Sequence, residues 1–303
     1  MNEKGEWNVK ILGKNLKQIL PGLAAAGAAA GAAFYARSEY EKNHFVTGTY
    51  VIRSEKIREK DRKFIFLTDL HEKRFGIDNA PLIRAIRREA PDGILVGGDM
   101  VVCRRSDGGK PVCEATLSLL RRLSEDFPVW YSYGNHEDRI GESEPFFSQL
   151  REAGVRILDD ESVDIGSDLR ITGCRVDEKY YRHVLTMPEI AADAIERHIG
   201  PCRSRDGEER FELLMLHSPL FLKAAAKWGA DLVLSGHFHG GTVRIPAIGG
   251  LMTPQYQFFC PYCSGGFEEE KTRMIVGRGL GTHSVNIRIN DMPELLVLKL
   301  VRG

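Results

Sequence analysis

The sequence lacks an excess of charge of either sign. Its 303 residues include 42 basic and 42 acidic side chains, so the formal net charge at pH 7 is zero. A balanced charge creates no long-range field that would attract a polyanion. No stretch of interleaved aromatic and basic residues, typical of nucleic-acid surfaces, occurs along the chain. We therefore expect no nucleic-acid partner.

The sequence also lacks internal repeats and, after residue 45, any low-complexity linker. Hydrophobic residues make up 43% of the chain and charged residues 28%, which is ordinary for a soluble globular protein. A chain of this length can bury a sizeable core. We expect one folded domain over 46–303, preceded by a segment of different character over 1–45.

Cysteine is scarce, and the nucleophile motif Gly-x-Ser-x-Gly is absent. Cys103 and Cys113 flank a polar stretch. Cys260-Pro-Tyr-Cys263 is a CxxC motif, but it lacks the strand-to-helix setting of a thioredoxin-type site. These four residues could form disulfides or a small structural zinc site, or could remain unpaired thiols.

Long uncharged runs are scarce as well, and one of them is Ile19–Ala36, which is rich in alanine and glycine. Its length is at the lower edge for a membrane-spanning helix. We interpret residues 19–36 as an uncleaved transmembrane anchor, with a cleaved signal peptide and a soluble alanine-rich helix as alternatives. The lysines before Ile19 predict that the amino terminus lies inside the cell and the domain outside. The alternative is a domain on the cytoplasmic face.

From His44 onward, strand-like and helix-like segments alternate, and strand-like segments crowd together near the carboxyl end. This order predicts an α/β domain with mixed sheets. The predicted helices are Pro81–Glu89, Glu114–Leu123, Glu144–Ala153, Pro188–Ile199 and Pro219–Trp228. The predicted strands are Tyr50–Arg53, Lys63–Thr68, Ile94–Gly97, Val129–Tyr133, Val155–Leu158, Ser162–Ile165, Leu169–Gly173, Phe211–Leu216, Leu232–Leu234, Thr242–Ile245, Arg273–Val276 and Leu295–Leu300.

Side chains suited to metal binding follow apolar runs at five places. In chain order they are Asp69, His71, Asp99, Asn135, His136, His217, His237 and His239. Open α/β sheets place their sites at the carboxyl ends of strands, so these side chains are expected to converge. Asp, Asn and His ligands suit Mn²⁺, Zn²⁺ or Fe, and two carboxylates with several neutral donors suffice for two ions.

Each of these residues also has a simpler interpretation. Asp69 could cap a helix, Asp99 and Asn135 could be turn residues, and His217 could be a buried, hydrogen-bonded core histidine. His237 and His239 could face solvent. All of these alternatives would have to hold together, which makes five strand endings of one design hard to explain by chance.

Five short motifs carry a resemblance to the calcineurin-like metallophosphoesterase superfamily. They are Asp69-x-His71, Gly98-Asp99, Gly134-Asn-His136, His217 and Gly236-His-x-His239. The resemblance covers roughly residues 46–303, which would then be a metallophosphoesterase catalytic domain. Further residues are similar to a membrane-associated bacterial branch of phosphodiesterases, namely Phe75-Gly76, Asn79, Pro91-Asp92, Arg278-Gly-Leu-Gly281, Arg288 and Pro293-Glu294. The family fold implies a four-layer αββα sandwich of two mixed β-sheets flanked by helices, here with an N-terminal hydrophobic helix.

The resemblance implies two metal sites that share Asp99. The first ion would be held by Asp69, His71, Asp99 and His239, and the second by Asp99, Asn135, His217 and His237. His136 would be the catalytic residue, touching the phosphate and protonating the leaving oxygen. Glu137 stands where many members have Asp, which we expect to change the support of His136.

The expected activity is hydrolysis of a phosphodiester, a pyrophosphate or a phosphomonoester by attack of a metal-activated hydroxide, with a phosphodiester favoured. Arg104, Arg105 and Arg278 are candidates for substrate binding, with a solvated surface position as the alternative. A membrane tether would favour an amphiphilic or lipid-linked phosphate ester. The alternatives are a non-catalytic binding scaffold on the same fold and a mainly structural membrane protein.

Overall fold

The computed structural model describes residues 9–202, 209–282 and 285–303, with side chains described from Leu20 onward. The chain forms two compact units, Met1–Tyr40 and Glu41–Gly303. We call the second the catalytic unit, because it contains all the predicted site residues.

Helix α1 (Val9–Asn43) contains Pro21 and the whole alanine-rich stretch. In the part of the chain that the structure describes, no helix combines the length and the apolar character needed to cross a membrane. The membrane anchor over 19–36 stays a prediction. Alanine and glycine contribute little apolar surface, and Arg37 ends the uncharged run. The predicted segment begins at Ile19, one residue before the first residue whose side chain the structure describes.

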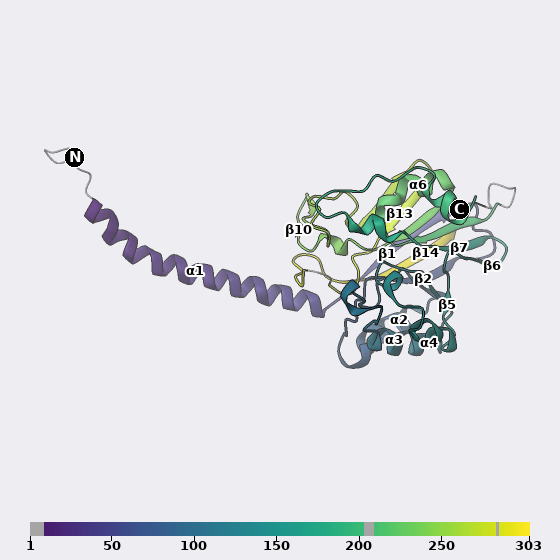
Figure 1. The fold of residues 1–303 in the computed structure, drawn as a ribbon, viewed down its shortest axis with the longest axis horizontal. Coiled ribbons are helices and arrows are strands. Elements are labelled where there is room, and N and C mark those ends of the chain that lie inside the picture. The colour runs from purple at the N-terminus through teal and green to yellow at the C-terminus, as the bar shows by residue number, and fades with distance from the viewer. Residues whose placement is uncertain (1–8, 203–208, 283–284) are drawn as a thin grey trace. The chain divides into compact units, whose positions relative to one another are not determined.

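Two six-stranded mixed sheets form the centre of the catalytic unit (Figure 1). The first has the order β1 (Val46–Ser54), β14 (Glu294–Arg302), β2 (Arg62–Leu67), β3 (Gly93–Val96), β4 (Val129–Tyr131) and β5 (Arg156–Ile157). The second has the order β12 (Gly265–Glu269), β13 (Thr272–Val276), β9 (Leu232–Ser235), β8 (Phe211–Leu216), β7 (Leu169–Cys174) and β6 (Ser162–Ile165). A small antiparallel pair, β10 (Arg244–Ile245) and β11 (Gly249–Gly250), lies outside both.

The alternation of side chains along the strands builds three successive core layers. Along β2, Phe64 and Phe66 pack between the two sheets, whereas Ile65 and Leu67 pack under the helices. Along β8, Leu213 also packs between the sheets. Successive side chains of a strand point to opposite faces, so one apolar strand can serve two layers.

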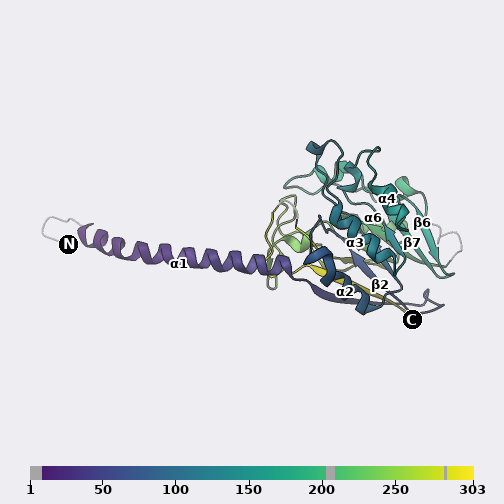
Figure 2. The same cartoon turned by 90° about the horizontal axis from the view of Figure 1, so that it is seen from below.

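Helices cover the outer face of each sheet, which completes the predicted αββα sandwich. Helices α2 (Ala80–Glu89), α3 (Glu114–Ser124) and α4 (Phe146–Glu152) cover the first sheet. Helices α5 (Ala194–Ile199) and α6 (Leu222–Trp228) cover the second. Figure 1 shows α2–α4 and α6 on opposite sides of the strands, and Figure 2 shows α2 and α3 lying along β2 from below.

The prediction of a helix over Pro188–Ile199 is wrong in its first half, because α5 begins only at Ala194. The amide of Ala194 donates to Ala191 O at 3.0 Å in a turn, and Asp193 stands directly before the helix. Aspartate at this position commonly marks a helix start.

Candidate metal centre

Five strands of the two sheets end at the predicted ligands. Strands β2, β3 and β4 run parallel in the first sheet, and β8 and β9 run parallel in the second. The loops directly after them place the ligand-type side chains together, and all of these are buried. They are Asp69, His71, Asp99, Asn135, His136, His217, His237 and His239. The structure therefore brings together every predicted ligand and His136.

The ligand atoms form two neighbouring groups that share no residue, and a third group, His71, Asp99 and His136, overlaps both. In the first, Asp69, His71 and His239 offer atoms that lie within 4.8 Å of one another. The two imidazole Nε2 atoms of His71 and His239 are 3.2 Å apart, and His239 Nε2 is 3.5 Å from Asp69 Oδ1. The second group, Asp99, His217 and His237, has the same compactness.

Asp99 lies between the two groups. Its Oδ2 is 3.2 Å from His217 Nε2 in the second group and 3.8 Å from His71 Nε2 in the first. This is the place that the resemblance implies for a carboxylate shared by two ions.

Hydrogen bonds behind the histidines determine which ring nitrogen faces the centre. His217 Nδ1 lies 2.7 Å from Gly97 O, and His239 Nδ1 lies 3.2 Å from Gly281 O. Carbonyl oxygens only accept, so each Nδ1 carries a proton, and in the neutral ring each Nε2 presents its lone pair to the centre. His237 is turned the other way, with Nε2 at 3.1 Å from Gln255 Oε1 and Nδ1 facing Asn135.

The side-chain amide of Asn135 lies 3.2 Å from both Asp99 Oδ2 and His237 Nδ1. With its nitrogen facing them, the amide would donate two hydrogen bonds. With its oxygen facing them, three electron-pair donors point at one another, which only a cation between them stabilises. The amide can adopt either orientation, so this position fits a ligand that turns its oxygen inward when an ion is bound.

The buried charges fit a cation-binding site. Burial raises the pKa of Asp69 to about 7. Burial also opposes ionisation of Asp99, but the neighbouring His217 and His136 hold its pKa well below the usual range. Burial disfavours a charged His217, yet Asp99 raises its pKa to about 10. Two carboxylates among imidazoles are the ligand set of divalent transition ions, and the residues present fit two of them. The assignment of each ligand to one ion stays a prediction.

Several ligands have strained backbone conformations that the sequence did not indicate. Asp69, His71, Asp99, His237 and His239 have φ angles of 52°, 44°, 51°, 70° and 47°. Residues other than glycine rarely adopt this left-handed region, and such strain clusters at functional sites. The adjoining loop needs glycine for a different reason, since a Cβ on Gly134 would collide with Asp99 Oδ1.

Glu137 stabilises the loop of Asp99 and does not support the His136 ring. Its carboxylate accepts hydrogen bonds from the amides of Asp99 (2.7 Å), Met100 (2.9 Å) and Gly134 (3.0 Å), and from Tyr131 Oη (2.6 Å). Burial and the nearby Asp99 raise the pKa of Glu137.

The His136 ring has a backbone partner, because its Nδ1 accepts from the Cys103 amide at 3.0 Å. The neutral ring therefore carries its proton on Nε2. That Glu137 changes the support of His136 relative to family members with Asp stays a prediction.

A cavity of about 500 Å³ opens beside His71 and His136. It is lined by four arginines, which are Arg104, Arg105, Arg139 and Arg182. The first two were predicted from the sequence and the last two were missed. Arg278 is not among the residues lining this cavity; its amide donates to Glu294 and its carbonyl accepts from Arg288.

Glu178, on the 3₁₀ helix η4 (Glu178–Arg182), holds three of these arginines together. Its carboxylate lies 2.7 Å from Arg105, 3.2 Å from Arg139 and 2.8 Å from Arg182. Partial burial opposes its ionisation, but these guanidiniums lower the pKa of Glu178 to about 2. No sequence signal groups these residues, because η4 lies far along the chain from Arg105.

Cys103, Cys113, Cys260 and Cys263 are free thiols. Of the alternatives considered for Cys103, Cys113, Cys260 and Cys263, the structure has unpaired thiols. Among the described residues, no group with metal-binding geometry contains a cysteine.

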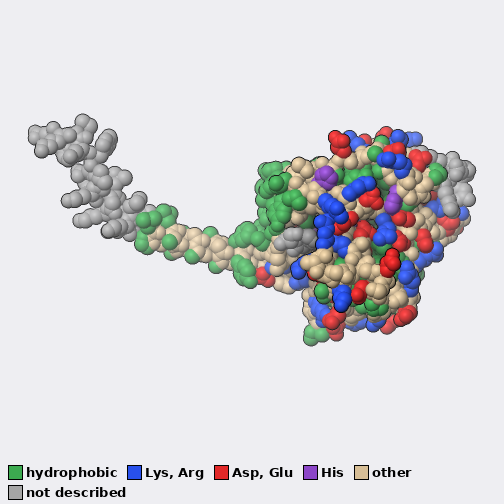
Figure 3. All heavy atoms as spheres, in the orientation of Figure 1, with side chains coloured by type: hydrophobic (Ala, Val, Ile, Leu, Met, Phe, Trp, Pro, Cys, Tyr) green, Lys and Arg blue, Asp and Glu red, His purple; other side chains and the backbone are tan. Residues whose placement is uncertain are grey.

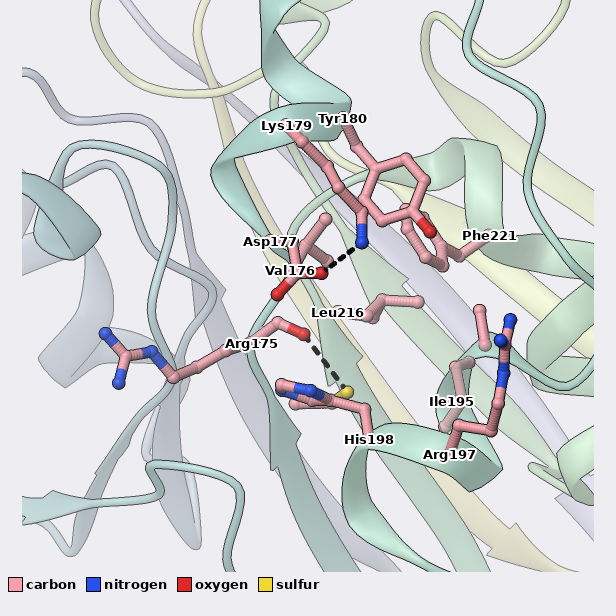
Figure 4. Close-up of a pocket in the computed structure, with 12 residues that line it drawn as sticks. Arg175, Val176, Asp177, Lys179, Tyr180, Ile195, Arg197, His198, Leu216 and Phe221 are labelled. Carbon is pink, nitrogen blue, oxygen red and sulfur yellow. Dashed lines mark hydrogen bonds and ion pairs between the residues drawn. The ribbon is translucent and has the colours of Figure 1, made fainter.

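A second cavity, of about 210 Å³, lies between η4, β7 and α5 (Figure 4). Its cations are matched by carboxylates. Lys179 lies 2.7 Å from Asp177, as Figure 4 shows, and His198 lies 2.9 Å from Asp160. Arg197 is paired with Asp193 at 3.2 Å. In the cavity beside the metal ligands, by contrast, the single carboxylate of Glu178 pairs with three of the four arginines, so positive charge is in excess there.

Comparisons with known proteins agree with this geometry. The model of the calcineurin-like phosphoesterase family matches residues 62–241. The metallophosphoesterase YkuE of Bacillus subtilis is 26% identical over 295 residues, covering 94% of this chain and 96% of its own. The phosphodiesterase YaeI of Escherichia coli is 26% identical over 246 residues, covering 79% of this chain and 82% of its own. Among solved structures, a dimetal phosphatase from Danio rerio is similar with a TM-score of 0.44 and 14% identity, covering 73% of this chain and 88% of that one.

Proposed function

Since the chain belongs to the calcineurin-like phosphoesterase family, we propose that it is a phosphodiesterase with two divalent ions at the centre described above. Its metal-dependent phosphoesterase activity already follows from the family and from the two groups of ligand atoms. The observation that carries the proposal is the position of Asp99 between these groups. The similarity to the phosphodiesterase YaeI supports diesters over monoesters.

The chain's own residues would bind and orient the substrate. Asp69, His71, Asp99 and His239 would hold one ion, and Asp99, Asn135, His217 and His237 the other. Such ions, when bound, activate water and neutralise charge on the phosphate. The water oxygen bonds to phosphorus, the bond from phosphorus to the leaving oxygen breaks, and that oxygen takes up one proton.

His136 would act on the phosphate through Nε2. Because Nδ1 accepts from the Cys103 amide, Nε2 is the nitrogen with a proton to offer. A hydrogen bond from Nε2 can hold a phosphate oxygen or the leaving oxygen, and a positioned acid contributes about 10²–10⁴-fold to the rate. Arg104 and Arg105 would contact the negative charge of the substrate from the cavity beside it.

The test is to measure bound metal and hydrolysis on the same full-length preparation. We expect up to two ions of manganese, zinc or iron per chain by mass spectrometry of the digested protein. Bis(p-nitrophenyl) phosphate should be cleaved faster than p-nitrophenyl phosphate, and a chelator should stop both reactions. Bound metal without hydrolysis of any phosphate ester would favour the non-catalytic scaffold instead.

We also propose that the catalytic unit works outside the cytoplasm. The support is the run of lysines before Ile19 and the balanced charge of the residues just after Ala36.

A further inference from the structure

Two loops of the catalytic unit expose large hydrophobic side chains. The first contains Val184, Leu185 and Met187, and the second contains Phe258 and Phe259 after β11; Ile248 is exposed just before β11, in the turn that follows β10. We call these six residues the apolar loop patch. Leu185 is 67% exposed and Ile248 is 64% exposed, and Figure 3 shows hydrophobic side chains gathered on the side of the catalytic unit that carries β10. Contiguous apolar surface of this kind commonly marks an interaction site.

Hydrogen bonds hold the two loops together in this arrangement. The Leu185 amide donates to Gln255 O at 3.0 Å, and Gln257 Nε2 donates to His183 O at 3.3 Å and to Thr186 O at 2.6 Å. Gln257 is buried, so the bonds that join the loops are shielded from water. The exposed side chains therefore project from a supported structure.

The backbone at two patch residues is strained. Leu185 and Phe259 have φ angles of 66° and 52°, which are unfavourable for leucine and phenylalanine. Strain that keeps apolar side chains exposed to water stabilises nothing in the isolated molecule. It is expected where the side chains meet an apolar partner.

The apolar loop patch adjoins the arginine-lined cavity. Val184 belongs to both, since it lines the cavity and is 57% exposed, and Arg182 lines the cavity two residues before it. In the second loop, Pro254 and Gln255 line a smaller cavity together with Asp99 and His237. The metal ligands, the arginine-lined cavity and the apolar loop patch are therefore neighbouring regions of the surface.

We propose that the substrate is an amphiphilic phosphate ester at a lipid surface. Its anionic head would enter the arginine-lined cavity, and its hydrocarbon chain would lie against the apolar loop patch. The inference rests on the proposed function for the chemistry of the head. The arginine-lined cavity lies next to the apolar loop patch. An amphiphile has the same arrangement, with a negatively charged head joined to a hydrocarbon chain, so this arrangement favours an amphiphile as the occupant. Four arginines line the cavity and one carboxylate, that of Glu178, pairs with three of them, so the excess of positive charge matches an anionic head.

The first experiment compares two diesters that share one reacting group. Full-length, metal-loaded protein is assayed with methyl p-nitrophenyl phosphate in water and with hexadecyl p-nitrophenyl phosphate in mixed micelles. We expect the double variant Leu185→Ser with Phe258→Ser to raise KM for the hexadecyl ester at least tenfold, with kcat unchanged and the methyl ester unaffected. Ile77→Ser is the matched control, since Ile77 is an exposed hydrophobic residue outside the patch. Equal kinetics of the double variant and the native protein on the hexadecyl ester would overturn the proposal.

The second experiment detects contact with lipid without any hydrolysis. Tryptophan replaces Phe258 in one variant and Ile77 in another, and brominated phosphatidylglycerol–phosphatidylcholine vesicles serve as quenchers. We expect added quenching for Phe258→Trp and none for Ile77→Trp. Absence of quenching, or a dimer in sedimentation that Leu185→Ser dissociates, would show that lipid does not occupy the patch. Quenching combined with failure to cleave either ester would refute the proposed function while the lipid contact stands.

Discussion

Asp99 is the residue on which the two groups of ligand atoms depend. Its Oδ2 is close to imidazoles of both, so removal of the carboxylate leaves each ion short of a charged ligand. We expect Asp99→Ala to reduce bound metal from up to two ions to less than one per chain and to lower the hydrolysis rate at least 10²-fold. The measurement is metal content by mass spectrometry alongside the diester assay.

The matched control for Asp99→Ala is Asp126→Ala, whose carboxylate pairs with Arg87 at the surface. That change should alter neither metal content nor rate, because exposed ion pairs contribute little. An Asp99→Ala protein with its full complement of ions would contradict the assignment of the shared ligand.

His136 is buried among the ligands but has a backbone partner on Nδ1 and its proton on Nε2. We expect His136→Ala to keep its metal and to lose activity, most strongly on esters with poor leaving groups, since nitrophenolate needs little protonation. The measurement is the ratio of kcat for an alkyl ester to kcat for a nitrophenyl ester. Equal losses on both would assign His136 to holding the phosphate instead of protonating the leaving oxygen.

For single residues, the chemistry of the site could be predicted from the sequence, because Asp, Asn and His side chains after apolar runs indicate a site for divalent metal ions. The backbone of Asp69 or His239 could not, since a left-handed φ depends on contacts from other segments. The positions of Arg139 and Arg182 were missed for the same reason: Glu178 brings them together from separate parts of the chain.

Glu137 connects the loops that follow β3 and β4. Its four hydrogen bonds join the amides of Asp99, Met100 and Gly134 to Tyr131 Oη. A buried amide that loses its partner costs about 1–3 kcal/mol. We therefore expect Glu137→Ala to destabilise the protein by about 3 kcal/mol or more and to weaken metal binding, as measured by urea unfolding with and without added metal.

Exposed Glu125, at the end of α3, provides the matched control for Glu137. Glu125→Ala should change the free energy of unfolding by no more than about 0.5 kcal/mol. A Glu137→Ala protein as stable as this control would show that the two loops hold their conformation without the carboxylate.

Most strands of the two sheets could be predicted, because each is a short apolar run bounded by turn residues. Strand β12 was missed, since Gly265-Gly266 and its glutamates give no apolar alternation; it forms by pairing with β13. The sandwich itself came from the resemblance, as periodicity alone does not tell which sheet a strand joins.

Charge on the ligands makes the stability of the whole molecule depend on pH. Without metal, the pKa of Asp69 is raised from 3.8 to about 7 and that of His217 from 6.5 to about 10. Both groups hold their protons more tightly in the folded protein than in the unfolded chain. Their contribution to the free energy of unfolding is therefore fully present below their unfolded-state pKa values, and it is lost as the pH rises through their folded-state pKa values. We expect the Tm of chelated protein to fall between about pH 5 and pH 9.

Metal-loaded protein should behave in the opposite way, because ions bind the deprotonated ligands and are released by acid. Its Tm should fall as the pH is lowered below about 6. The measurement is a series of thermal scans across this range with and without chelator. Parallel curves in the two series would mean that Asp69 and His217 do not bind the ions.

The location of the catalytic unit is a property of the whole chain that the sequence predicts and the fold does not test. We expect protease added to cells stripped of their outer wall to digest this unit while the membrane stays intact. Digestion only after the membrane is broken, with the protein in the membrane pellet, would place the unit on the cytoplasmic face. Recovery of full-length protein in the soluble fraction would remove the anchor altogether.

The left-handed backbone at the ligands has a consequence for protein engineering. Glycine adopts this left-handed conformation without strain. Replacing His71 or His239 by glycine therefore removes a metal ligand and relieves the local backbone strain at the same time. Inactivation and stabilisation then coincide at these positions. Such a glycine variant, unable to complete turnover and less strained than the native protein, would serve as a trap for capturing the natural substrate from a cell extract.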